Sequence, residues 1–367
     1  MKARGSFSRC IATLFFVSIY CLLGQASAQA LLESPVGTTQ GTFQATAKGA
    51  AQYSIPIDVS PGAGGVEPDL SIIFDSTAGV SFLGPRFRIA GLSQINRCPA
   101  TLAQDGLYEP VIFQQQINSR YCLDGKRLVS SGPGSQRFRT EVEEFRDVRA
   151  TYEANLDPKE WTVRTKSGLT MTYGSRASIG ACSQPEASRI TGIRPGYLQI
   201  DEVNQLWLLS RVEDTSGNWM EFCYRDFDTG SGVEVLPVSI HYTGNDQAGL
   251  SPFAKVEFQY RDTAGAESRG YFLGTKQSKT QVLDKLTTYV ENEVVKEYRF
   301  DYGVRGLSSR EHLDSVRECA SSMASDSDCL LPTRFSWEGD LSGFLPGDRV
   351  TSSSAPRETL INRPDLG

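Results

Sequence analysis

The stretch that decides the fold lies between Gly41 and Arg97. It contains alternating segments and turns in this order: Tyr53-Ser54-Ile55-Pro56-Ile57, Pro61-Gly62, Pro68-Asp69-Leu70-Ser71-Ile72, Leu83-Gly84 and Ile89-Ala90-Gly91-Leu92-Ser93-Gln94-Ile95-Asn96-Arg97. Apolar residues recur at every second position of the first segment, which predicts a half-buried β-strand. Pro56 removes a ladder donor, so we expect that strand at a sheet edge or at a bulge. None of these residues is a plausible catalyst, and the stretch favours a scaffold.

The glycines of Pro61-Gly62-Ala63-Gly64-Gly65 raise the alternative of a phosphate-binding loop. Such a loop continues into Gly-Lys-Ser/Thr and a helix, whereas Leu70, Ile72 and Phe74 predict another strand here. We therefore interpret these glycines as turn residues.

Residues 1–28 predict a cleaved secretory signal. Lys2, Arg4 and Arg9 precede a 13-residue, mostly apolar run at 11–23, and Ala26-Ser27-Ala28 matches a small-x-small cleavage site. A stable membrane anchor needs about 20 apolar residues, so the run is too short for that role. Cleavage after Ala30 and an uncleaved anchor remain the alternatives.

Charge and length bound what the mature chain does. The signal removes three basic residues and no acidic one, which changes the formal net charge from −6 to −9 and leaves 339 of 367 residues. Nucleic-acid affinity rests on Lys and Arg that neutralise phosphates, so we expect no nucleic-acid partner. No later segment has the length and apolarity of a membrane span, which predicts a soluble protein that is secreted or periplasmic. The length allows two or three domains.

Six cysteines remain after the signal is removed, and an even number in an exported chain indicates disulfides. Six cysteines allow 15 pairings, and sequence proximity favours Cys98–Cys122, Cys182–Cys223 and Cys319–Cys329. Zinc is the alternative, but the chain has no Cys-x-x-Cys and its two histidines lie far from any tight cysteine pair. We predict no metal and no other cofactor.

From Trp161 onward the sequence predicts a series of β-hairpins. Each unit is an alternating run, a polar or glycine-containing turn, and a second run that ends on aromatic residues. The predicted units cover residues 161–173, 209–224, 238–260 and 283–302.

An aromatic-x-aromatic pattern closes several of these units at spacings of roughly 36 to 42 residues. It occurs as Phe222-Cys223-Tyr224, Phe258-Gln259-Tyr260, Phe300-Asp301-Tyr302 and Phe335-Ser336-Trp337. A repeated hairpin buries its apolar face only against its neighbours, so this loose repeat predicts an extended, curved sheet. The alternative is an ordinary β-domain in which such strand ends recur by chance.

The predicted fold class is therefore all-β, with antiparallel, hairpin-rich sheets that begin sandwich-like and continue as a curved shell. Few short helices are expected, and residues 308–319 are the candidate for one, with Leu313 and Val316 on one face. We predict a signal at 1–28, a β-domain at 29–150, a hairpin-repeat region at 151–345 and a linker at 346–367. The polar, proline-broken tail has no closing element, which fits either the front part of something longer or a shortened gene product.

Tests for catalysis find little. A serine hydrolase needs a base, and only His241 and His312 are available, without a Gly-x-Ser-x-Gly elbow. The carboxylate pairs Glu143-Glu144 and Asp226-x-Asp228 fit solvated strands as well as glycosidase or calcium chemistry, and the twelve-position calcium loop is absent. We predict that the chain is not an enzyme.

Residues 37–97 resemble the N-terminal region of SpvB-type proteins, the family of toxin-complex B components and their Rhs-repeat relatives. The resemblance continues more loosely to about residue 337. Further motifs that carry it are Arg120-Tyr121-Cys122-Leu123-Asp124-Gly125-Lys126-Arg127-Leu128, Asp214-Thr215-Ser216-Gly217-Asn218, Ile240-His241-Tyr242-Thr243-Gly244-Asn245 and Cys329-Leu330-Leu331-Pro332-Thr333-Arg334-Phe335-Ser336-Trp337. The chain departs from the family at Phe74-Asp75-Ser76 and Pro85-Arg86-Phe87, where it keeps an aromatic in each place.

The resemblance implies the opening wall of a β-rich shell that encloses a toxin, without propeller repeats, Rhs repeats or toxin. It implies downstream Rhs or toxin-complex components as partners and a link to virulence. We therefore predict a non-catalytic, structural N-terminal part of a secreted protein. The rival is a cell-surface module that binds carbohydrate or protein through exposed aromatics, with these tryptophans as candidates: Trp161, Trp207, Trp219 and Trp337.

Overall fold

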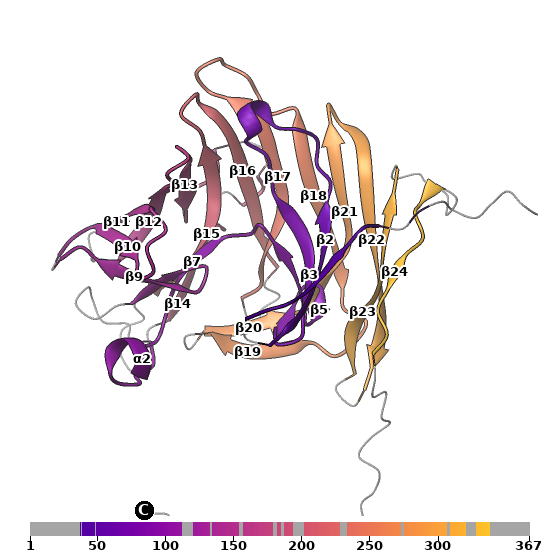
Figure 1. Ribbon diagram of the computed structural model, residues 1–367, viewed down its shortest axis with the longest axis horizontal. Helices are drawn as coiled ribbons and strands as arrows, with labels where there is room; N and C mark the ends of the chain where they lie inside the picture. The colour runs from indigo at the N-terminus through magenta and orange to yellow at the C-terminus, as the bar shows by residue number, and fades with distance from the viewer. Residues whose placement is uncertain are drawn as a thin grey trace, which may run out of the picture.

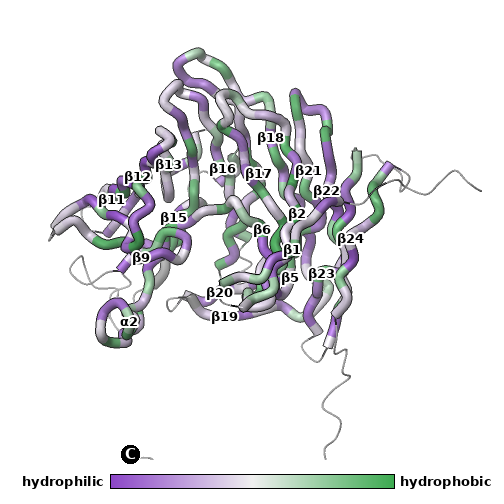
Figure 2. The backbone as a smooth tube through the Cα atoms, viewed as in Figure 1, coloured by the Kyte–Doolittle hydropathy of each residue, from purple (hydrophilic) through white to green (hydrophobic). Residues whose placement is uncertain are grey.

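Strands dominate the part of the chain that the computed structural model describes, namely residues 37, 39–47, 49–111, 120–132, 134–153, 157–178, 182–184, 187–193, 202–227, 233–272, 275–306, 309–320 and 328–337. The sheets are antiparallel, and helix α2 (Leu102–Asp105) and the 3-10 turn η1 (Ala63–Gly65) are short. The all-β prediction is confirmed. Figure 2 shows the cause, because hydrophilic and hydrophobic residues alternate along many strands.

The deciding stretch forms a small four-stranded sheet. Its order is β1 (Thr42–Ala45), β2 (Ala51–Ile57), β3 (Leu70–Asp75) and β6 (Phe87–Ala90). Strands β4 (Val80–Ser81) and β5 (Gly84–Pro85) form a separate hairpin before β6. Gly91 follows β6 with φ +90°, and a Cβ there would lie 2.1 Å from the carbonyl oxygen of Asp69. Only glycine fits this turn without a backbone shift.

Eight strands close into a barrel. In order around it they are β7 (Gln94–Arg97), β8 (Tyr121–Leu123), β9 (Lys126–Ser130), β10 (Arg137–Thr140), β11 (Asp147–Tyr152), β12 (Pro158–Arg164), β13 (Thr170–Tyr173) and β15 (Glu202–Glu213). The ring closes because β15 pairs with β7 through residues 206–208 and with β13 through residues 209–213. Strand β14 (Arg189–Ile193) pairs with the first half of β15.

The long strand β15 also begins an open sheet, which Figure 1 shows extending away from the barrel. Its further strands are, in order, β16 (Asn218–Asp226), β17 (Val235–Asn245), β18 (Ala254–Asp262), β21 (Gln281–Val290), β22 (Glu293–Arg305), β23 (Arg310–Cys319) and β24 (Thr333–Arg334). Strands β19 (Ser268–Phe272) and β20 (Thr275–Lys279) form a two-stranded sheet of their own.

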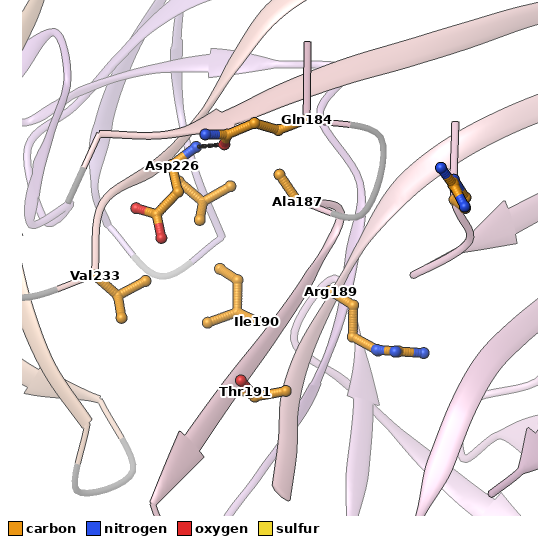
Figure 3. A pocket seen from close by; sticks show the side chains of 9 residues that line it. Gln184, Ala187, Arg189, Ile190, Thr191, Asp226 and Val233 are labelled. Carbon is orange, nitrogen blue, oxygen red and sulfur yellow. Dashed lines mark hydrogen bonds between the residues drawn. The ribbon is translucent and has the colours of Figure 1, made fainter. Parts of the chain in front are cut away.

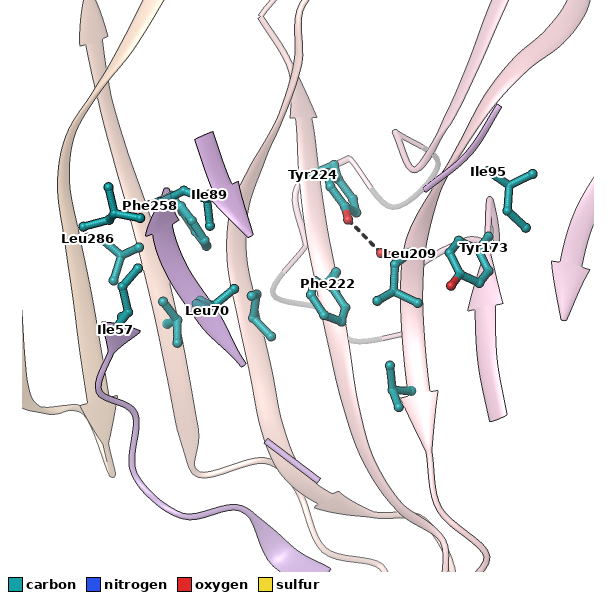
Figure 4. Packing of buried hydrophobic residues seen from close by; sticks show 14 of the residues in the cluster. Ile57, Leu70, Ile89, Ile95, Tyr173, Leu209, Phe222, Tyr224, Phe258 and Leu286 are labelled. Carbon is teal, nitrogen blue, oxygen red and sulfur yellow. Dashed lines mark hydrogen bonds between the residues drawn. The ribbon is translucent and has the colours of Figure 1, made fainter. Parts of the chain in front are cut away.

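The four-stranded sheet lies over one face of the open sheet. Figure 4 shows Ile57, Leu70 and Ile89 near Phe258 and Leu286, and all five belong to one hydrophobic core. The hydroxyl of Tyr298 also accepts a hydrogen bond of 2.9 Å from the backbone of Asp58. This two-layer packing corresponds to the sandwich-like start that the sequence predicts.

The predicted helix at 308–319 is wrong. Residues 310–319 form strand β23, which pairs with β22 along its whole length. Glu311 and Leu313 are buried at alternate positions, and a bulge between Asp301 and Tyr302 of β22 shifts the register. Because of that shift, Leu313 and Val316 are both buried at a spacing of three, which mimics helical periodicity.

Pro56 lies at a locally open edge of its strand, as its missing N–H predicts. It pairs with Ser71 of β3 on one side, while the pairing of β2 with β1 ends at Ser54. The missing N–H therefore falls on a locally open edge of β2.

Several predictions concern other parts of the chain. The signal and the tail at 346–367 lie outside the described residues. Within those residues, no helix has the length and apolarity needed to cross a membrane. The division at residue 150 stays a prediction, and it falls inside β11, a strand of the barrel that pairs with β12.

Candidate functional site

The aromatic-x-aromatic motifs make the same kind of hydrogen bond at successive positions of the open sheet. The last aromatic of each motif donates a hydrogen bond to a backbone carbonyl of an earlier strand. The four bonds run from Tyr224 to Leu209 (2.8 Å), Tyr260 to Pro237 (2.8 Å), Tyr302 to Leu283 (2.7 Å) and the Trp337 indole to Leu313 (3.0 Å). In each repeat, one side-chain donor thus links the second strand or its end to the first strand of the same hairpin.

Each tyrosine lies where its hairpin ladder has ended. Leu209, Pro237 and Leu283 lie beyond the residues that pair with the tyrosine's own strand. The pairing with the following strand shifts register at the same positions, between Cys223 and Tyr224, between Gln259 and Tyr260, and between Asp301 and Tyr302. Burial raises the pKa of all three tyrosines well above the ordinary value, so each stays a neutral donor.

The tryptophans do not form an exposed platform. Trp161, Trp207 and Trp219 are buried, and the first two lie inside the barrel with their ring centroids 5.7 Å apart. Trp337 is partly buried and packs edge-on against Phe87 at 6.1 Å. The predicted use of these residues as carbohydrate platforms is therefore not supported, because a stacking sugar needs an accessible ring face.

The two aromatics at which the chain departs from the SpvB-type pattern pack together. Phe74 and Phe87 have ring centroids 5.3 Å apart, and Phe87 also contacts Phe335 at 4.7 Å. These rings join the four-stranded sheet to the end of the open sheet.

The histidines occupy separate, partly buried positions on the open sheet. His241 Nε2 lies 3.0 Å from the hydroxyl of Ser239, and burial lowers the pKa of His241. A serine hydrolase would need a carboxylate on the other ring nitrogen. Glu257 lies opposite Ser239, but among the described residues it binds Lys255 at 3.1 Å and makes no hydrogen bond to His241.

His312 takes a packing position. Its Nδ1 lies 3.1 Å from the carbonyl oxygen of Arg310, and its ring meets Trp337 edge-on at 4.8 Å. The two histidines therefore do not belong to one arrangement of acid, base and nucleophile.

The carboxylate pairs act locally. Glu144 forms ion pairs with Lys126 and, at 3.5 Å, with Arg146, and Glu143 accepts a hydrogen bond of 2.6 Å from the backbone of Phe145. Asp226 borders a cavity, and Asp228 lies outside the described residues. Within the described ranges no three His, Cys, Asp or Glu side chains gather as a metal site would require.

Disulfides join the three cysteine pairs that sequence proximity favours. Cys98–Cys122 links the end of β7 to β8, with Cα atoms 5.9 Å apart. Cys319–Cys329 ties β23 to the segment before β24, and the third pair is Cys182–Cys223. The bonds thus fasten both the barrel and the far end of the open sheet.

A cavity of about 670 Å³ lies between β14 and the adjoining ends of β16 and β17. In Figure 3, Asp226 and Val233 lie together on the left, Arg189 lies on the right, and Ile190 lies between them. The backbone N–H of Asp226 donates a 2.6 Å hydrogen bond to the side chain of Gln184. Four apolar residues line it together with five polar or charged ones, Arg176, Gln184, Arg189, Thr191 and Asp226, and no histidine or cysteine belongs to the lining.

A buried ion pair lies inside the barrel and was missed from the sequence. The guanidinium of Arg97 binds Asp157, and the two side chains are only 3% and 6% exposed. Arg97 also donates to the carbonyl of Asn204 at 2.7 Å, and it lies over the rings of Tyr121 and Trp207. Arg97 lies two residues after Ile95 in an alternating strand, so the sequence pattern already places it on the inward face.

These features define a class of fold, an eight-stranded barrel that continues into an open sheet covered by a smaller sheet. It is the fold of the N-terminal domain of SpvB and of toxin-complex B components. No family model matches the chain, and no curated protein matches it in sequence.

Two solved structures show this fold. The N-terminal domain of the effector protein SpvB from Salmonella typhimurium strain LT2 matches with a TM-score of 0.53 and 14% identity, over 73% of this chain and 99% of that domain. The crystal structure of TcdB2-TccC3 matches with a TM-score of 0.60 and 14% identity, over 83% of this chain. This chain spans only 17% of the length of that larger chain.

A third match is the structure of the Photorhabdus luminescens Tc holotoxin pore. Its TM-score is 0.54 at 13% identity, over 78% of this chain and 15% of that one. At such identities the likeness concerns the fold.

Proposed function

We propose that this chain is the non-catalytic, structural N-terminal part of a secreted Rhs- or toxin-complex-like protein. Coverage carries the proposal, because the similarity takes in 99% of the SpvB N-terminal domain but only 17% of the TcdB2-TccC3 chain. The matching region is therefore a unit of its own in one protein and a small part of a large assembly in another.

The contacts support a wall-forming role. The open sheet ends at β24, whose two residues pair only with β23 among the described strands. An edge strand presents backbone donors and acceptors to a further strand, and at this edge the backbone N–H of Leu331 already donates to the carbonyl of Gly37 at 3.1 Å. The tyrosine bonds that tie each hairpin hold the sheet in shape up to that end.

Compartment and organisation belong to the same proposal. Three disulfides fit an oxidising compartment, in agreement with the secretory signal that the sequence predicts. We propose the division into a signal at 1–28, a β-domain at 29–150, a hairpin region at 151–345 and a linker at 346–367. The expected partners are downstream Rhs or toxin-complex components.

The test co-expresses the mature chain with the Rhs-repeat and propeller components encoded in the same genome. We expect the chain to co-purify with them as one particle by size-exclusion chromatography and mass measurement. Leu331→Asp, at the partly exposed edge beside β24, is expected to reduce co-purification. Tyr271→Asp, on the separate hairpin β19–β20, is the matched control and is expected to leave it unchanged. An assembled shell from which the chain stays absent contradicts the proposal.

A further inference from the structure

The outer wall of the barrel carries a groove rich in arginine. The groove has a volume of about 360 Å³ and lies over β10, β11 and β12. Its charged lining is Arg137, Asp147, Arg149 and Arg164, with hydroxyl groups from Ser135 and Thr162 beside them. None of these residues takes part in the hairpin ties or in the end of the open sheet.

Strand alternation and register bring these side chains together. Phe138, Val148 and Val163 point into the barrel, so their neighbours along each strand point outward. Arg137 lies directly opposite Arg149, and Asp147 lies directly opposite Arg164. Four charged groups from three adjacent strands thus occupy one patch of the outer face.

Positive charge is in excess within this groove. The carboxylate of Asp147 accepts from Arg137 at 2.6 Å and from Arg149 at 3.0 Å. Arg164 is exposed and has no ion-pair partner among the described residues. The four groups therefore carry a net charge of +2, in a chain whose formal net charge is −6. Arg137 and Arg149 lie directly opposite one another, where like charges destabilise a sheet, and the single carboxylate of Asp147 offsets only one of these two charges.

Donor capacity is also in excess. Each guanidinium has five N–H groups, and the contacts with Asp147 use the Nε of Arg137 and of Arg149. Burial alone would raise the pKa of Asp147, but the hydrogen bonds from the two arginines outweigh it and the pKa is lowered. Asp147 is thus a fixed anion that holds two of the three arginines in place, while their terminal nitrogens remain for a ligand.

We propose that this groove binds a doubly charged oxyanion, the phosphate monoester of a small sugar. Guanidinium groups bind such oxyanions through paired N–H bonds, and a charge of +2 matches a dianion. The hydroxyl of Thr162 supplies a neutral donor and acceptor for a sugar hydroxyl, whereas that of Ser135 is already bonded to the backbone of Arg137. The volume falls in the range of small-ligand sites, about 300–1,000 Å³.

The test measures binding by titration calorimetry at constant ionic strength in chloride. The probes are glucose 6-sulfate, glucose 6-phosphate, inorganic sulfate and unmodified glucose. We expect glucose 6-phosphate, a dianion at neutral pH, to bind more tightly than inorganic sulfate and more tightly than the singly charged glucose 6-sulfate, and glucose not to bind. The difference between the two esters measures the recognition of the second charge.

Variants locate the binding. Arg164→Gln removes a guanidinium without breaking an ion pair, and we expect it to weaken ester binding by about tenfold or more, the typical effect of a charged hydrogen bond. Arg164→Lys keeps the charge and is expected to weaken binding less. Arg88→Gln makes the same change at an exposed position of β6, in the four-stranded sheet, and is the control. Circular dichroism and thermal unfolding check that each variant keeps the fold.

Three outcomes would overturn the inference. They are glucose 6-phosphate binding no tighter than that of chloride, equal losses in Arg164→Gln and Arg88→Gln, and inorganic sulfate binding as tightly as glucose 6-phosphate. The last outcome would reduce the groove to a simple anion site.

Discussion

The barrel and the open sheet share strand β15, yet they bury their apolar residues in different ways. The barrel pairs its last strand with its first and fills the enclosed space with Tyr121, Phe138, Trp161 and Trp207, whose rings meet one another edge-on or tilted. The open sheet has no such closure and covers one face with a second sheet instead. Its other face carries cross-strand charges.

The two regions differ in whether a further strand can pair with them and in how they hold a buried charge. In the closed barrel each strand from β7 to β13 has a barrel neighbour on both sides, and only the long β15 also pairs with β14 and β16. Side chains fill its interior, so a charge inside needs a partner, as Arg97 has in Asp157. The open sheet keeps an end at β24, and its tyrosine ties repeat from hairpin to hairpin. We infer that the barrel anchors the fold while the open sheet extends it.

The largest expected effect compares a tryptophan from each region. Trp161→Ala empties the centre of the barrel, where the side chain is fully buried, and should lower the free energy of unfolding by about 3–5 kcal/mol. Trp337→Ala removes a partly buried ring at the end of the open sheet, and we expect about 1–2 kcal/mol. Urea unfolding followed by circular dichroism measures both. Equal losses would contradict the separate roles of the two regions.

The second prediction concerns the charge inside the barrel. Arg97→Met leaves Asp157 buried without its cation and should destabilise by about 3–5 kcal/mol. Arg97→Met combined with Asp157→Leu removes both charges and should restore most of that loss. The exposed pair Arg269–Glu267 is the control, because breaking a surface pair changes stability by about 0–1 kcal/mol. If the double variant is as unstable as the single one, the two side chains stabilise the barrel by their packing and not by their charges.

The third prediction tests the ties of the open sheet. Tyr302→Phe removes the donor to the carbonyl of Leu283 and leaves that carbonyl without this bond, so we expect a loss of about 1–2 kcal/mol. Tyr260→Phe should behave in the same way at Pro237. Tyr271→Phe, at an exposed position, should change nothing measurable. If the first two variants match the third, the repeated bonds do not stabilise the hairpins.

Much of this architecture was predictable because strand periodicity is local. The hairpins at 161–173, 209–224, 238–260 and 283–302 all pair as antiparallel neighbours. Their turns contain residues that tolerate the left-handed region, such as Gly217 and Asn292, which has φ 72°. Even the aromatic repeat has a physical counterpart, since its last member is the donor that ties each unit.

Closure of the barrel was not predictable, because it depends on pairing between distant segments. Strands β7 and β15 pair although more than a hundred residues separate them in the chain, and neither sequence indicates which strand it pairs with. Strand β23 was missed because a bulge altered its burial period. The arginine groove likewise exists only through the register of three strands, since Arg137, Arg149 and Arg164 are ordinary outward positions when each strand is considered alone.

The smallest expected effect is a difference in sign between two carboxylates when the pH falls. For Glu311 of the open sheet, burial raises the pKa, but hydrogen bonds from Arg261, Thr263 and the backbone of Ala264 outweigh it, and the pKa lies below the ordinary 4.5. A lowered pKa contributes stability that is present above pH 4.5 and is lost as the pH falls through the folded value.

For Asp157 in the barrel, burial dominates over the attraction of Arg97 and raises the pKa above the ordinary 3.8. The folded state then holds its proton more tightly, so this contribution is largest below pH 3.8 and declines as the pH rises through the folded value. Glu311→Gln should therefore make stability less sensitive to acid, and Asp157→Asn should make it more sensitive. Urea unfolding at a series of pH values from neutral to acidic measures both slopes. Two changes of the same sign would mean that Arg97 and the backbone of Asn204 outweigh the burial of Asp157, as the hydrogen bonds do at Glu311.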